Sequence, residues 1–197
     1  MLDLSIVIQA GGKSSRMGTD KALVAFRGAP LLRHILSQTA QLALPTLIIT
    51  NQPAGYLQFG LPLHGDIHQD WGALGGLHAA IYHAPTRHCL VLACDMPFVN
   101  LPLLQHLIAL AEDFDAIVPR LTDEKLAEPF RAVYSRACLP AIEAAIAAGK
   151  RRVNSFFDQV NIRYVDQPEI EQYDPRLLSF FNVNTPEELA LAEQMDA

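Results

Sequence analysis

The stretch LSIVIQAGGKSSRMGTDK (residues 4–21) decides the fold. Its first five residues are a short β-branched run, which predicts a buried first strand. Glycines, hydroxyls and cations follow at once. This is the layout of an anion-binding loop, because glycine lets successive backbone N–H groups converge on phosphate oxygens. Arg16 and Lys21 supply positive charge. The alternative is the ordinary polar loop that ends any strand of an α/β protein, but the density of glycines and cations favours anion binding.

Two common phosphate-binding motifs are excluded. Residues 12–14 read GKS, the end of the P-loop pattern G-x-x-x-x-G-K-[ST], but the first glycine of that pattern would fall at Val7. Valine within a strand cannot make the required turn. A G-x-G-x-x-G fingerprint for dinucleotides is also missing from the sequence.

Outward from this stretch, short apolar strands alternate with helical patterns. This alternation predicts an α/β fold with a mostly parallel central sheet and helices on both faces. Further strands are expected at residues 46–50, 61–64, 89–93, 115–119, 129–134 and 161–165. Helices are expected at residues 30–42, 75–84, 102–112, 136–148 and 152–159, and a last one where Thr185, Pro186 and Glu188 form a capping box.

Composition narrows the class of protein. The chain has 197 residues, half of them hydrophobic, which suits a single domain with one sizeable core. Its formal net charge of -6 argues against nucleic-acid binding. The three cysteines lack metal-site spacing and favour buried thiols in a reducing compartment. No apolar run approaches the length of a membrane span and no signal peptide is visible, so we expect a soluble, cytoplasmic protein.

Polar residues follow several of the expected strands. Ligands of parallel sheets bind outside the carboxyl ends of the strands, so we expect the glycine loop, Asn51, Asp66 and Asp95 to share one edge. Asp95 follows the most apolar strand and is a candidate ligand for Mg²⁺, which favours one or two carboxylates together with phosphate oxygens. The alternative is that Asp95 caps the next helix. For Asp66 a turn role is nearly as well supported, and Asp70 competes with it.

The loop resembles the signature of nucleotidyltransferases with a Rossmann-like fold, L-A-G-G-x-S-x-R-M-G-x-x-K. Every position from Ala10 to Lys21 fits, and only Gln9 departs, where an aliphatic residue is usual. Three further segments narrow the resemblance to molybdenum cofactor guanylyltransferases. They are Cys94-Asp95-Met96-Pro97, the A-G-x-R-R-like run at residues 148–153, and FNVNTPEEL at residues 181–189. Met96 is a small departure from the family pattern, in which a small or hydroxyl residue can occur at this position.

This resemblance implies transfer of GMP from GTP to molybdenum-molybdopterin, giving molybdopterin guanine dinucleotide and pyrophosphate. It implies a nucleotide-binding half at about residues 1–119 and a molybdopterin-side half at about residues 120–197. Transient contact with molybdoenzymes or cofactor-inserting proteins would follow. Contact with nucleic acid or a membrane is not expected.

The resemblance also assigns roles to residues. Those implied to contact the nucleotide are Gln9, Ala10, Gly11, Gly12, Lys21, Asn51, Asp66 and Asp95. Arg16, Lys21 and Asp95 are the implied catalytic residues, with Mg²⁺ on Asp95. The molybdopterin side would be formed by Arg151, Arg152, Asn182 and Asn184, although the two arginines fit a solvated helix start about equally well.

Other functions remain open at this stage. The same chemistry could serve a molybdopterin cytidylyltransferase or a sugar-phosphate nucleotidyltransferase. A different class is a non-catalytic module that binds GTP or the cofactor. Retention of Arg16, Lys21 and Asp95 favours an enzyme.

Overall fold

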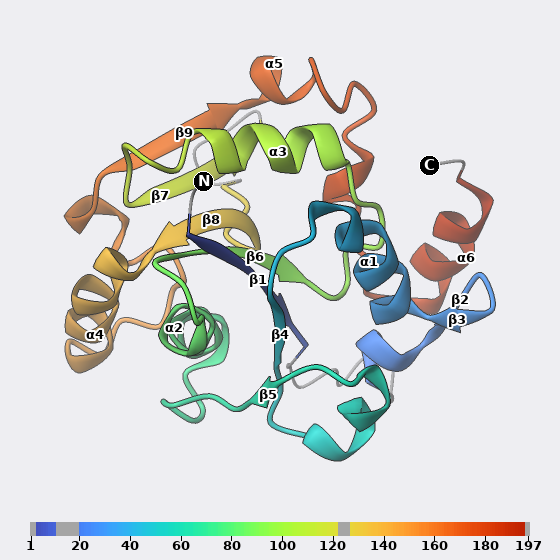
Figure 1. The fold of residues 1–197 in the computed structure, drawn as a ribbon, viewed down its shortest axis with the longest axis horizontal. Helices are drawn as coiled ribbons and strands as arrows, with labels where there is room; N and C mark the ends of the chain where they lie inside the picture. Colours follow the sequence, from blue (N-terminus) through green and yellow to red (C-terminus); the bar gives the residue numbers. More distant parts are fainter. Residues whose placement is uncertain (1–2, 11–19, 122–126, 196–197) are drawn as a thin grey trace.

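A twisted, mostly parallel sheet forms the centre of the molecule (Figure 1). The computed structural model describes residues 3–10, 20–121 and 127–195. Seven strands lie in the order β5-β4-β1-β6-β8-β7-β9. Their bounds are β1 Leu4–Gln9, β4 Thr46–Ile49, β5 Leu63–His64, β6 His88–Ala93, β7 Ala116–Arg120, β8 Arg131–Ser135 and β9 Ile162–Asp166.

The register brings strand ends together at one edge. β1 runs parallel to both β4 and β6, with Ile8 opposite Ile48 and Leu92. β8 is antiparallel to both of its neighbours, β6 and β7. The first residue of β8, Arg131, therefore pairs with Leu92 near the carboxyl end of β6. A separate hairpin of β2 (Ala25–Phe26) and β3 (Ala29–Pro30) follows the glycine loop.

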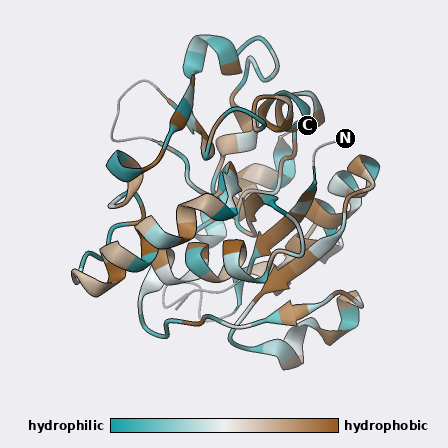
Figure 2. Ribbon diagram, turned by 60° about the vertical axis from the view of Figure 1, so that its left-hand side comes forward, coloured by the Kyte–Doolittle hydropathy of each residue, from teal (hydrophilic) through white to brown (hydrophobic). Residues whose placement is uncertain are grey.

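Helices cover both faces of the sheet, and alternation along the strands explains the two layers. Ile6 and Ile8 of β1 join one core with helices α1 and α3, whereas Val7 joins the other with α2 and α4. Figure 2 shows the central strands largely in brown, whereas the helices carry both brown and hydrophilic colours. The helices are α1 Leu31–Thr39, α2 Gly72–His83, α3 Leu101–Ala109, α4 Leu139–Ala147, α5 Gln167–Ile170 and α6 Pro186–Gln194.

The predicted fold class is confirmed, and so is the capping box. The Thr185 side chain accepts from the Glu188 N–H at 3.2 Å, and the Glu188 carboxylate accepts from the Thr185 N–H at 3.0 Å. The helix predicted at residues 152–159 is wrong: turns and a short 3-10 segment, Phe157–Gln159, take its place. The Ser155 and Phe157 N–H groups donate to carbonyls three residues back, those of Arg152 and Asn154, and this hydrogen bonding gives turns in place of an α-helix.

Two smaller differences concern the ends of elements. α2 begins at Gly72, three residues before the predicted start, and α5 was not predicted. The predicted polar loop at residues 121–128 lies largely outside the described residues. Across residues 3–10, 20–121 and 127–195, every helix falls short of the length and apolar character needed to cross a bilayer.

Candidate functional site

Lys21, Asp95 and Asn184 meet at the carboxyl edge of the sheet. Lys21 Nζ donates a hydrogen bond to Asn184 Oδ1 at 2.5 Å and lies 3.6 Å from Asp95 Oδ2. The side chains of Lys21 and Asp95 are 21% and 25% exposed, so a solute can still reach them. A cation, a carboxylate and a carboxamide are thus brought together from positions far apart in the chain.

Backbone contacts fix the position of Asp95. The Cys94 N–H donates to Gln9 O at 3.1 Å, which ties the end of β6 to β1. The Val183 N–H donates to Asp95 O at 2.8 Å and brings the C-terminal segment to the same place. The alternative that Asp95 caps α3 is wrong, because Asn100 occupies the N-cap and accepts from the Leu103 N–H at 2.9 Å.

Asp20, a residue beyond those predicted from the sequence, holds the turn that carries Lys21. Its carboxylate accepts from the Ala22 N–H at 3.1 Å and from the Tyr56 hydroxyl at 2.6 Å. Burial, together with Asp20, raises the pKa of Tyr56 far above its ordinary value, so the phenol stays a neutral donor. An aspartate just before a short helical turn was the available signal for Asp20. Tyr56 carried no such signal.

Asn51 and Asp66 form a second pair at the ends of β4 and β5. Asn51 Nδ2 donates to Asp66 Oδ2 at 2.8 Å, and the Asp66 N–H donates back to Asn51 Oδ1 at 2.9 Å. Asp66 Oδ1 is buried without a hydrogen-bond partner among the described residues. Asp70 instead adopts a left-handed backbone, and its carbonyl accepts from Arg151 Nη1 at 2.7 Å. Asp66 is therefore an observed partner of Asn51.

Gln9 is the last residue of β1, and its side chain lies against α2. Its amide rests against Gly76, where a Cβ would fall 2.3 Å from Gln9 Nε2. Gln9 Oε1 is buried and lacks a partner within the described chain. The Ala10 N–H donates to Ile49 O at 2.9 Å, so the sheet already uses this group. Gly11, Gly12 and Arg16 lie outside the described residues.

Arg131, also beyond the residues predicted from the sequence, is a buried cation beside this edge. It is 1% exposed, and Nη2 donates to Met96 O at 3.2 Å. Burial lowers the pKa of Arg131 to about 10, and the nearby carboxylates of Glu128, Asp174 and Asp95 oppose that shift. The guanidinium therefore remains charged at neutral pH. A single charge at the start of the apolar run Ala132–Tyr134 was the available signal.

The remaining predicted residues are Arg151, Arg152, Asn182 and Asn184, and of these only Asn184 contacts Lys21. Arg151 stacks over Trp71, with 4.9 Å between the guanidinium carbon and the ring centroid, at the N-terminal end of α2. Arg152 is exposed and Asn182 is half-buried. The Asn184 N–H donates to Glu188 Oε2 at 2.6 Å, so α6 orients this asparagine.

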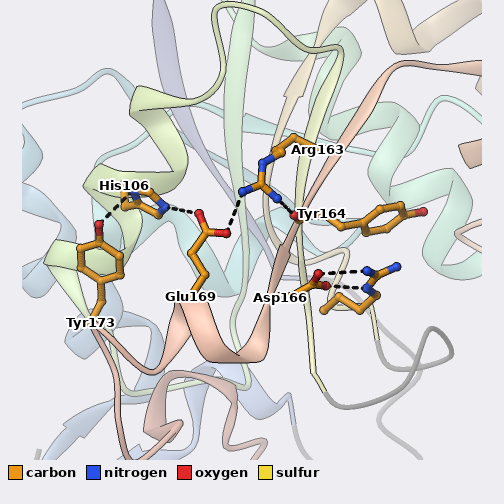
Figure 3. A network of polar contacts seen from close by, with 7 residues as sticks. His106, Arg163, Tyr164, Asp166, Glu169 and Tyr173 are labelled. Atoms are coloured by element: carbon orange, nitrogen blue, oxygen red, sulfur yellow. Dashed lines mark hydrogen bonds and ion pairs between the residues drawn. The ribbon is translucent and has the colours of Figure 1, made fainter.

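A separate polar network joins α3, β9 and α5 (Figure 3). Glu169 accepts from Arg163 Nη2 at 2.7 Å, and its other oxygen lies 2.7 Å from His106 Nε2. Tyr173 contacts His106 Nδ1 at 3.1 Å. Both ring nitrogens of His106 are therefore engaged, which indicates a structural role in attaching the last strand.

Among the described residues, no three His, Cys, Asp or Glu side chains gather as metal ligands. Asp95 could hold a cation only if other ligands, from a substrate or from water, complete its coordination. That suits Mg²⁺, which is commonly bound by one or two carboxylates and completed by substrate phosphates and water.

Several known proteins are similar to this chain over most of its length. The family model described as "MobA-like NTP transferase domain" matches residues 6–165. A probable molybdenum cofactor guanylyltransferase of Pelotomaculum thermopropionicum is 35% identical, over 99% of this chain and 94% of that protein. The molybdenum cofactor guanylyltransferase of Vibrio cholerae is 35% identical, over 95% of this chain and 90% of that protein. The crystal structure of molybdopterin-guanine dinucleotide biosynthesis protein A from Archaeoglobus fulgidus is 30% identical, with a TM-score of 0.84 over 96% of this chain and 97% of that one.

Proposed function

Because the chain belongs to the MobA-like NTP transferase family, we propose that it transfers GMP from GTP to molybdenum-molybdopterin, releasing pyrophosphate. The observation that carries the proposal is the cluster of Lys21, Asp95 and Asn184. It combines a cation, a carboxylate of the kind that binds a hard metal ion and an amide, at the sheet edge where ligands of such folds bind.

The nucleoside half of GTP lies over β1, β4 and β5 in this proposal. Asn51 orients Asp66, and the unpartnered Asp66 Oδ1 is an acceptor suited to a ribose hydroxyl or a base N–H. Gln9 and Ala10 lead into the loop, where Gly11 and Gly12 are proposed to contact the phosphates. Arg16, in the same loop, is proposed to help neutralise them.

The part of the site proposed to bind molybdopterin is formed mainly by residues from the C-terminal part of the chain. Asn184 Oδ1 accepts from Lys21, which leaves the amide nitrogen of Asn184 to donate to an incoming phosphate. Asn182, Arg151 and Arg152 are proposed to flank this substrate. Transfer of the product to a molybdoenzyme or an inserting protein, in the cytoplasm, completes the proposal.

The reaction is a displacement at phosphorus. An oxygen of the terminal phosphate of molybdopterin bonds to the α-phosphorus of GTP, the bond to the bridging oxygen breaks, and pyrophosphate leaves with the electron pair. Two anions must approach, so the chain contributes alignment and charge compensation and no covalent intermediate is needed. Lys21 offsets the charge that develops on the leaving group. A Mg²⁺ ion on Asp95 would supply further neutralisation of the reacting phosphates.

Pyrophosphate release from GTP or CTP, with and without molybdopterin, tests the reaction. We expect release that requires GTP, molybdopterin and Mg²⁺ together, and its loss in Asp95→Ala. Preference for CTP would favour a cytidylyltransferase. GTP binding without release would favour a non-catalytic module, and full Mg²⁺-dependent activity of Asp95→Ala would refute the metal assignment.

A further inference from the structure

The turn after β6 is held through two consecutive carbonyl groups. Asp95 O accepts from the Val183 N–H at 2.8 Å, and Met96 O accepts from Arg131 Nη2 at 3.2 Å. The first contact comes from the C-terminal segment and the second from the start of β8. The direction of the Asp95 side chain follows from its backbone, so both contacts help to set it.

Arg131 is an unusual residue for this position. It lies on the face of β8 that also carries Val133, which belongs to the core of α1 and α3. Removing a guanidinium from water costs several kcal/mol unless charges and hydrogen bonds compensate. Arg131 has one hydrogen bond, to a carbonyl, while Nε and Nη1 find no partner among the described residues.

The compensation is electrostatic and comes from three carboxylates. Glu128 precedes β8, Asp174 lies in the C-terminal segment, and Asp95 follows β6, and all three carboxylates act on the Arg131 charge. Asp174 is itself engaged, because it accepts from the Ser179 N–H at 2.8 Å. The carboxylates favour the charged form of Arg131, and its hydrogen bond to Met96 O ties that charge to the turn that carries Asp95.

We propose that Arg131 is a positioning residue: it holds the Asp95–Met96 turn so that the Asp95 carboxylate faces the metal ion and the reacting phosphates. This rests on the proposed function, since it assigns Asp95 the cation. Arg131 is too deeply buried to touch substrate and acts through Asp95. Groups that orient a metal ligand change metal affinity by about 10-fold to 100-fold when removed.

Arg131→Met provides the test, since it fills similar volume without the charge or the hydrogen bond. Arg131→Lys keeps the charge and one donor. Arg136→Met is the matched control, because Arg136 follows the far end of β8 and also donates to backbone carbonyls, those of Tyr82 and Ala84, both at 2.9 Å. Binding of Mn²⁺ by each protein with GTP present is measured by electron paramagnetic resonance. The Mg²⁺ concentration for half-maximal pyrophosphate release and the KM for GTP are measured in parallel.

We expect Arg131→Met to weaken Mn²⁺ binding at least about 10-fold and to raise the half-maximal Mg²⁺ concentration by a similar factor, with a smaller change in KM. Arg131→Lys should restore most of both, and Arg136→Met should change neither. Wild-type Mn²⁺ affinity in folded Arg131→Met, or an equal loss in Arg136→Met, would overturn the proposal. If Arg131→Met does not fold, Arg131→Gln, which also lacks the charge, must show the same loss. A wild-type protein that releases no pyrophosphate would refute the proposed function instead, and the Mn²⁺ comparison would still decide the role of Arg131.

Discussion

Replacing Gly76 with alanine should destabilise the protein when Gln9 is present and stabilise it when Gln9 is truncated. Gly76 is a buried residue of α2, and a Cβ there would fall 2.3 Å from Gln9 Nε2 and 2.9 Å from Gln9 Cδ. Both separations are shorter than atoms tolerate, so the Gln9 amide must move. Its Oε1 is already buried, so little free space is at hand.

The size of the effect follows from two opposing contributions. Alanine in a helix interior is favoured over glycine by about 0.8–1.0 kcal/mol. Overpacking a filled interior costs about 1–3 kcal/mol. Gly76→Ala should therefore lower the free energy of unfolding by up to about 2 kcal/mol in the wild-type background, and raise it by about 1 kcal/mol in Gln9→Ala. The coupling energy between the two positions should be about 1–3 kcal/mol.

Urea unfolding of the wild type, both single variants and the double variant measures this coupling. Gly75→Ala is the matched control in the same helix. Its Cβ would meet His68 O at 2.8 Å and Trp71 Cβ at 2.9 Å, so its cost should not depend on Gln9. An equal effect of Gly76→Ala in both backgrounds would refute the packing argument.

Three other predictions follow from the described contacts. Lys21→Met should lower the rate of pyrophosphate release by about 10²-fold to 10³-fold with an unchanged circular dichroism spectrum, and a rate within a few-fold of wild type would contradict the role given to Lys21. Thr185→Ala removes the hydroxyl that accepts from the Glu188 N–H and should cost about 1 kcal/mol in urea unfolding, whereas no loss would mean that the cap does not stabilise α6. Burial lowers the pKa of His78 and His83 below the ordinary value of 6.5, so below that pH the unfolded chain binds more protons than the folded one. The thermal unfolding midpoint should be constant above pH 6.5 and should fall as the pH drops below it. A wild-type midpoint that does not change over this pH range would contradict the prediction. So would a His78→Asn, His83→Asn variant whose midpoint changes with pH as that of the wild type does.

The sequence predicts the layers of this fold because its strands are short apolar runs bounded by turn residues. Prediction of the strands at residues 88–93 and 46–49 needed no tertiary information. Prediction of residues 152–159 did: their pattern suits a helix in isolation, but in the folded chain Ser155 and Phe157 donate to carbonyls three residues back and the segment forms turns. Tertiary packing decided that segment.

The residues of the site also differ in whether local sequence patterns predict them. Lys21 and Asp95 follow recognisable strand ends, so the loop and strand patterns predict them. The contact between Lys21 and Asn184 depends on how the C-terminal segment returns to the sheet, which no local pattern encodes. Arg131 and the packing of Gln9 on Gly76 are side-chain placements in the interior, and only three-dimensional neighbours make them visible.

The return of the C-terminal segment to β6 has a consequence for the order of events during protein synthesis. Lys21 and Asn184 are separated by 163 residues, and Asp95 is held from Val183. While residues 182–194 are still inside the ribosome, a nascent chain can form much of the sheet but cannot complete the group around Lys21. Incomplete chains would therefore be inert, and the site would form only after the segment leading into α6 has emerged.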